Sequence, residues 1–195
     1  FAEAARMAVS VKGPIVGKGE VVHPWRAQHG AEWMAKRYLR FSNTATGTGM
    51  SFGAAGAEVD VDKETGLVEM RRLAHAYDVG FALNPLGVEE QLQGGAGMAA
   101  GFALSEEVLY DNGQVLNPGY STYNMLTALD MPNTIPIIVE RNDPTEGPYG
   151  AKELGMGASC APGSAVASAI YDATGVMLKE YPATPERILK ALEGI

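Results

Sequence analysis

Two charged residues, Lys152 and Glu153, stand in a stretch that is otherwise rich in glycine, GPYGAKELGMGA at 147–158. Glycine lets a backbone approach a ligand closely, or adopt a positive φ at which a side chain would clash. The stretch therefore either makes an unusual set of turns or closes over a bound group. Glu153 is either half of a surface ion pair with Lys152, worth little free energy, or a carboxylate held near a reactive centre as a general base. Residue types alone leave both interpretations open.

A second group of polar residues lies in the stretch VEEQLQGGAGMAAG at 88–101, where Gln91 and Gln93 precede Gly94 and Gly95. Polar residues on a helix usually face solvent. An amide side chain, however, offers a donor and an acceptor together, which suits a heterocycle that carries both. The two glutamines are therefore candidate ligand-binding residues.

Other candidate sites are weaker. The stretch around Lys152 is not a phosphate-binding loop, because that loop requires a longer spacing and a serine or threonine after the lysine. His23, His29 and His75 have no second metal-binding residue at helical spacing, so structural or solvated roles are favoured and we predict no metal ligands. Cys160 has no cysteine or histidine partner, and we expect it to be a small buried apolar residue.

Composition excludes several classes of function. The chain has 195 residues, of which 46% are hydrophobic, and a formal net charge of −8 that argues against nucleic-acid binding. One cysteine excludes an internal disulfide and fits a reducing, cytoplasmic compartment. No apolar run approaches the ~20 residues of a membrane span. The opening FAEAARMAVS lacks an initiator methionine, so we expect the chain to be part of a longer sequence.

The elements that must position these residues follow one another without a regular βαβ rhythm, which predicts an α+β fold with a mixed β-sheet, hairpins and packed helices. No linker divides the chain, so residues 1–195 are expected to form one domain or part of one. We predict a helix over 2–10, hairpins over 56–79 and 106–117, a strand over 133–143, and helices over 83–104, 161–175 and 184–194.

Several blocks, in order, carry a resemblance to a known family: FGAAGAEVDVDKETGLVEM, AYDVGFALNPLGVEEQLQGGAGMAAGFALSEEVLYDNGQVLNP, TALDMP and GPYGAKELGMGASCAPGSAVASAIYDATG. Over about residues 49–195 the chain resembles the C-terminal part of the molybdopterin-binding subunit of the xanthine dehydrogenase/aldehyde oxidase family of molybdenum hydroxylases. The resemblance implies the fold of that domain, and a cofactor of molybdenum with molybdopterin, alone or as a dinucleotide. It also implies hydroxylation of a small N-heterocycle or aldehyde with water oxygen.

The resemblance implies partners as well. Electrons would leave through iron–sulfur clusters and FAD on other domains or subunits, and the remaining part of the molybdopterin subunit would complete the site. Gln91 stands where the family places a glutamine that hydrogen-bonds the pterin, and the glycine loop matches the family motif G-x-K-x-x-G-E. The residues implied to bind the cofactor are Gln91, Gln93, Gly94, Gly150, Lys152 and Gly155.

The chain departs from the family motif at its last position. The glutamate there is the general base of the family, and Met156 occupies that position in this sequence. A thioether cannot accept a proton, so Met156 is incompatible with the usual role. Two hypotheses follow: Glu153, three residues earlier, serves as the catalytic base, or the chain is a cofactor-binding or scaffold homologue without the base.

Overall fold

The computed structural model describes residues 51–141 and 148–194, which lie within one compact unit, Gly49–Ile195. The helix predicted over 2–10 and the two histidines His23 and His29 lie outside the described residues.

Among these residues, a mixed sheet is formed by β1 (Gly53–Val61), β2 (Val68–Asp78) and β5 (Asn133–Val139), in the order β1-β2-β5. β1 and β2 form the predicted antiparallel hairpin, with one bulge between Glu58 and Val59. β5 runs parallel to β2, and a parallel neighbour requires a long crossover connection. The residues between β2 and β5 supply it, and the predicted α+β class with a mixed sheet is confirmed.

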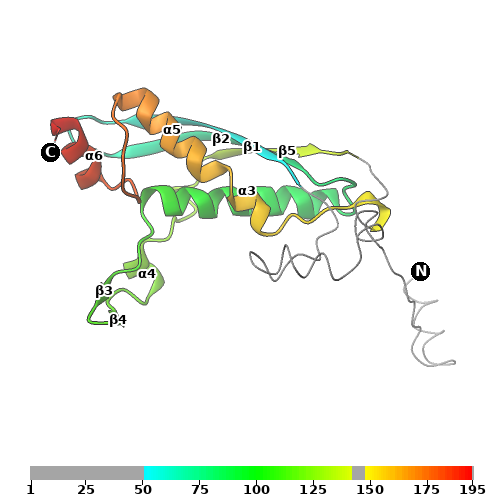
Figure 1. Ribbon diagram of the computed structural model, residues 1–195, viewed down its shortest axis with the longest axis horizontal. Coiled ribbons are helices and arrows are strands. Elements are labelled where there is room, and N and C mark those ends of the chain that lie inside the picture. Colours follow the sequence, from blue (N-terminus) through cyan, green and yellow to red (C-terminus); the bar gives the residue numbers. More distant parts are fainter. Residues whose placement is uncertain (1–50, 142–147, 195) are drawn as a thin grey trace, which may run out of the picture. The chain divides into compact units, whose positions relative to one another are not determined.

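Two helices, α3 (Pro85–Leu104) and α5 (Pro162–Thr174), pack on the same face of this sheet (Figure 1). α3 begins as predicted, because the Asn84 side chain accepts a hydrogen bond from the Gly87 N–H and Pro85 needs no partner at the first helical position. The apolar core between sheet and helices includes Met70, Leu73, Ala96, Ala100, Val166 and Ile170. None of the helices in the described ranges is long and apolar enough to cross a bilayer.

Between α3 and β5 the chain forms an arm, residues 105–131, that projects away from the sheet in Figure 1. It contains the second predicted hairpin, reduced to β3 (Tyr110–Asp111) and β4 (Gln114–Val115), and the short helix α4 (Tyr120–Tyr123). Asn112 and Gly113 have positive φ values at the hairpin turn, as expected for an Asn-Gly pair. The four-residue α4 was not predicted, because it is too short to show a periodic pattern.

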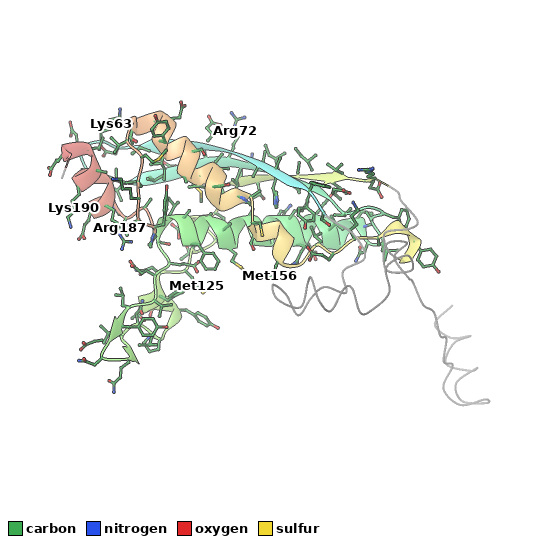
Figure 2. All side chains as sticks on the ribbon, in the orientation of Figure 1. Lys63, Arg72, Met125, Met156, Arg187 and Lys190 are labelled. Carbon is green, nitrogen blue, oxygen red and sulfur yellow. The ribbon has the colours of Figure 1, made fainter. Side chains whose placement is uncertain are left out.

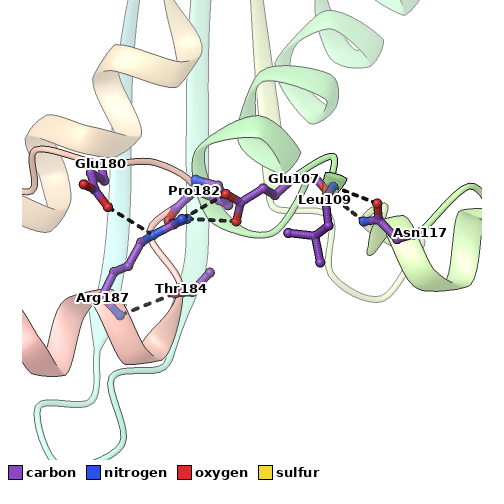
Figure 3. A network of polar contacts seen from close by, with 7 residues as sticks. All are labelled: Glu107, Leu109, Asn117, Glu180, Pro182, Thr184 and Arg187. Atoms are coloured by element: carbon purple, nitrogen blue, oxygen red, sulfur yellow. Dashed lines mark hydrogen bonds and ion pairs between the residues drawn. The ribbon is translucent and has the colours of Figure 1, made fainter. Parts of the chain in front are cut away.

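The base of the arm is held to the last helix, α6 (Pro185–Glu193), by an arginine clamp (Figure 3). Arg187 donates to both carboxylate oxygens of Glu107, at 3.1 and 2.9 Å, and to the Pro182 carbonyl at 3.0 Å. Asn117 then donates to the Glu107 carbonyl at 2.7 Å and accepts from the Leu109 N–H at 2.8 Å. The arginine lowers the pKa of Glu107 by hydrogen bonding, so the clamp stays charged at acidic pH.

His75 is buried in the middle of β2, with 1% of its surface exposed. Neither ring nitrogen has a hydrogen-bond partner in the part of the chain that the structure describes. Burial lowers the pKa of His75, because it disfavours the charged ring. The nearby backbone of Leu92 raises this pKa by a smaller amount, although it forms no hydrogen bond of normal geometry with the ring. His75 is therefore a neutral core residue, in agreement with the structural role predicted for it.

We predict that His75→Leu makes the stability of the protein less dependent on pH. In the unfolded state His75 has an ordinary pKa near 6.5. As pH falls through that value, the His75 ring therefore binds a proton in the unfolded chain but not in the folded chain. Folding stability therefore falls with decreasing pH, by up to about 1.4 kcal/mol per pH unit. Chemical unfolding measured between pH 5 and 8 should show a shallower slope in the variant, and an unchanged slope would contradict this account.

Candidate active site

The described part of the glycine loop, residues 148–158, is attached by its backbone to the segment that follows β2. The Phe81 N–H donates to the Gly150 carbonyl at 3.0 Å, and the Lys152 N–H donates to the Val79 carbonyl at 2.9 Å. Between these contacts Gly80 has φ +65°, and a Cβ on it would overlap the Gly150 carbonyl. Only glycine satisfies both conditions at this position, so the close approach of the two segments is specified by the sequence.

Lys152 and Asp78 form a buried ion pair that reinforces this attachment. The ammonium nitrogen lies 2.6 Å from Oδ2, and the two side chains are 3% and 8% exposed. Burial alone would raise the pKa of Asp78, but hydrogen bonds from Lys152 and from the Gly80 N–H outweigh it and lower that pKa. The hypothesis that Lys152 and Glu153 form a surface ion pair is therefore wrong, since the lysine side chain is buried and contacts Asp78 of β2.

Glu153 instead contacts Tyr77, the residue that precedes Asp78 at the end of β2. The Tyr77 hydroxyl donates to Glu153 Oε1 at 3.0 Å, and the rest of the glutamate is exposed. Burial, followed by the hydrogen bond with Glu153, raises the pKa of Tyr77, so the hydroxyl keeps its proton. Successive strand residues point to opposite faces, so Tyr77 and Asp78 hold Glu153 and Lys152 in two separate contacts.

Met156 begins the short helix η2 (Met156–Ser159), which follows the loop, and its side chain is 75% exposed. Cys160 comes directly after η2 and is also exposed, so the prediction that it is buried is wrong. The buried position of this turn is taken by Ala158, which packs against α3, and Cys160 is turned outward as a result.

α3 passes beside η2, where Gly95 faces Ala158, and Figure 2 labels Met156 at the start of η2. A Cβ on Gly95 would lie 2.6 Å from Ala158 Cβ, so this glycine sets the spacing between the two helices. Gln91 lies one turn before Gly95 on the same face, whereas Gln93 lies about 200° around the axis from Gln91. The structure does not bring the two glutamines together, and both are exposed.

The exposed face of α3 has room for a flat ligand. A Cβ added to Gly94 would meet nothing within 4 Å, so a ligand can approach the helix backbone there. Gln91 lies one turn before Gly94 on the exposed part of α3. In the described ranges no three histidine, cysteine or acidic residues are close enough to hold a metal ion.

Two residues that shape this site, Tyr77 and Asp78, were not singled out from the sequence. The pattern LAHAYDVG shows a strand that ends in a polar pair before glycine. A polar pair at a strand end is common, and only the three-dimensional pairing with residues 152 and 153 shows its role.

Comparison with known proteins agrees with this description. The family profile described as "Molybdopterin cofactor-binding domain" matches residues 1–132. The putative xanthine dehydrogenase molybdenum-binding subunit XdhA of Escherichia coli is 37% identical over 140 residues, covering 71% of this chain and 18% of the relative. A nicotinate dehydrogenase subunit of Pseudomonas putida is 34% identical over 158 residues, covering 80% of this chain and 13% of the relative.

A solved structure gives the same result for the fold. Aldehyde oxidoreductase from Desulfovibrio gigas superposes with a TM-score of 0.67 at 30% identity, over 73% of this chain and 15% of that one. The chain thus spans less than a fifth of the length of these relatives. The family profile includes residues 1–48, which are less diagnostic in the sequence, and ends before the glycine loop.

We predict that Gly95→Ala destabilises the fold whereas Gly94→Ala, one residue away, does not. The methyl group at 95 would overlap Ala158, including its backbone carbon at 2.7 Å, and overpacking of this kind costs about 1–3 kcal/mol. At 94 the methyl meets open space, and alanine favours a helix over glycine by roughly 0.5–1 kcal/mol. Thermal unfolding of the two variants measures the difference, and equal midpoints would contradict the packing described.

We predict that Lys152→Met destabilises the protein by about 3–5 kcal/mol, because it leaves the Asp78 carboxylate buried without its cation. Lys63→Met, at an exposed lysine in the β1–β2 turn, is the matched control and should change stability by less than about 0.5 kcal/mol. Denaturant unfolding gives both values. Similar losses in the two variants would show that the ion pair does not hold the loop.

Proposed function

Since the chain belongs to the molybdopterin cofactor-binding domain family, we propose that it forms one wall of the active site of a molybdenum hydroxylase, with Glu153 as the general base. The observation that carries this proposal is the placement of Glu153. Its carboxylate is fixed by Tyr77 at the end of β2, on a loop whose backbone is locked to the same strand end. Met156, at the family's base position, has a side chain that cannot take a proton.

The cofactor would be held from α3 and from the glycine loop. Gln91 offers an amide edge, and Gly94 and Gly155 allow close approach of a flat pterin. Gln93, on another face of α3, is the weakest member of the predicted set. The Lys152 ammonium is used in the ion pair with Asp78, and the Gly150 carbonyl accepts from Phe81; we therefore assign both residues to holding the loop rather than to direct contact.

When bound, the molybdenum cofactor supplies the two-electron oxidation that inserts a water-derived oxygen into the substrate. The contribution of this chain is to hold the pterin edge and to accept a proton. Glu153 Oε1 is occupied by the Tyr77 hydroxyl, so the other oxygen, Oε2, is the atom that would accept it. A carboxylate held in this way can act as a general base.

The complete protein would contain further domains, because the match to this chain covers only 18% of one relative and 13% of the other. Residues 1–195 are proposed to be the C-terminal portion of the molybdopterin-binding domain. The names of the relatives refer to xanthine, nicotinate and aldehyde as substrates, and we propose a small N-heterocycle or an aldehyde for this protein. Iron–sulfur and FAD partners and a cytoplasmic location belong to the same proposal.

We predict that Glu153→Gln lowers turnover of the assembled enzyme by about 10²–10⁴-fold, the usual contribution of a general base. The substitution keeps the size and the hydrogen-bonding capacity of the side chain, so molybdenum per protein, measured by elemental analysis, should not change. Glu193→Gln at the exposed end of α6 is the control and should leave turnover intact.

Two outcomes distinguish the alternatives. Full turnover in Glu153→Gln would exclude Glu153 as the base. If the unmodified protein binds molybdenum but turns over no heterocycle or aldehyde, and Met156→Glu gains turnover, the chain is a cofactor-binding homologue that lacks the base.

A further inference from the structure

The surroundings of Tyr77 are shaped to admit its ring and hydroxyl. Tyr77 lies near the end of the central strand β2 and is 5% exposed. A Cβ on Gly157 would overlap the Tyr77 hydroxyl, and a Cβ on Gly53 would lie 2.9 Å from the ring carbon Cδ2. On the strand itself, the His75 ring contacts Tyr77 edge-on, with ring centroids 6.1 Å apart. A tyrosine fits here because two glycines leave room for it.

Within the described part of the chain, the Tyr77 hydroxyl is the hydrogen-bond donor that reaches the Glu153 carboxylate. The glutamate is an exposed residue of the glycine loop, and its carboxylate would otherwise be free to rotate in solvent. A hydroxyl on a buried ring is a rigid donor, so this contact converts the flexible side chain into one with a fixed direction. The side chain of Glu153 therefore loses its conformational entropy when the protein folds rather than during the reaction.

We propose that Tyr77 is the positioning residue of the active site: its hydroxyl holds Glu153 Oε1 and thereby aims Oε2 as the atom that accepts the proton. This inference rests on the proposed role of Glu153 and adds to it the residue that makes the displaced base usable. Tyr77 therefore fixes the direction of the proposed base.

Other charged groups near the pair are few among the described residues. Cys160 and the Ser51 side chain lie near the Tyr77 hydroxyl. Lys152 and Asp78, which are next to Glu153 and Tyr77 in the sequence, form the buried ion pair. Tyr77→Phe therefore removes one defined contact of Glu153 and leaves these groups in place.

The test uses the complete enzyme, with its partner subunits and cofactor, and the variant Tyr77→Phe. Phenylalanine keeps the ring between the two glycines, so the fold and the molybdenum content should not change. We expect kcat to fall by about tenfold while KM stays unchanged, because the carboxylate loses the donor that fixes its direction but no group that binds the substrate. Tyr171→Phe, at an exposed tyrosine of α5, is the matched control and should change neither quantity.

A readout independent of activity comes from thermal unfolding of Tyr77→Phe, Glu153→Ala and the double variant. If the hydroxyl and the carboxylate interact, the second substitution should lower the unfolding midpoint less in the double variant than it does alone. Strictly additive shifts would overturn the proposed contact, even if one variant were too unstable to assay for turnover.

The two proposals can fail separately. If Glu153→Gln keeps full turnover, Glu153 is not the base and the role of Tyr77 is lost with it. If Glu153→Gln is inactive but Tyr77→Phe leaves kcat unchanged, Glu153 remains the base and the positioning role of Tyr77 is overturned.

Discussion

The structure around the candidate site depends on one constraint: the end of β2 must hold the glycine loop. Two consecutive strand residues do so, Tyr77 through Glu153 and Asp78 through Lys152. The ion pair is the more demanding contact, because a buried charge without its partner is strongly destabilising. Lys152 points inward to Asp78, and the next residue, Glu153, is exposed and contacts Tyr77. The position of the proposed base therefore follows from the position of the lysine.

This constraint gives a physical account of the departure from the family motif. A glutamate three residues later in the loop would stand at Met156, at the start of η2, where the side chain is exposed and η2 packs through Ala158 instead. At 153 a carboxylate has a rigid donor and a locked backbone. The loop is thus held at 153 by Tyr77, which lies outside the family motif, and at 152 by the lysine of that motif.

Much of this fold is predictable from local signals. Alternation of apolar and polar residues identifies the β1–β2 hairpin, Asn84-Pro85 and Thr184-Pro185 identify helix starts, and the Asn-Gly turn identifies the hairpin of the arm. Contacts between distant residues are not predictable in this way. Lys152 could be paired with its neighbour Glu153 or with any acidic residue, and the burial of Cys160 depends on which side of η2 faces α3. Helix geometry implies that Gln91 and Gln93 lie on different faces of α3, but it does not identify which of them binds a ligand.

The Lys152–Asp78 and Arg187–Glu107 contacts join residues that are 74 and 80 positions apart. Contacts between distant residues form more slowly than local ones, because closing the long loop between them costs conformational entropy. The β1–β2 hairpin and α3 consist of local contacts and can form before either. A chain stalled at that stage would have most of its regular secondary structure but no assembled glycine loop. Helix content measured by circular dichroism would therefore overstate the fraction of molecules that are competent to hold a cofactor.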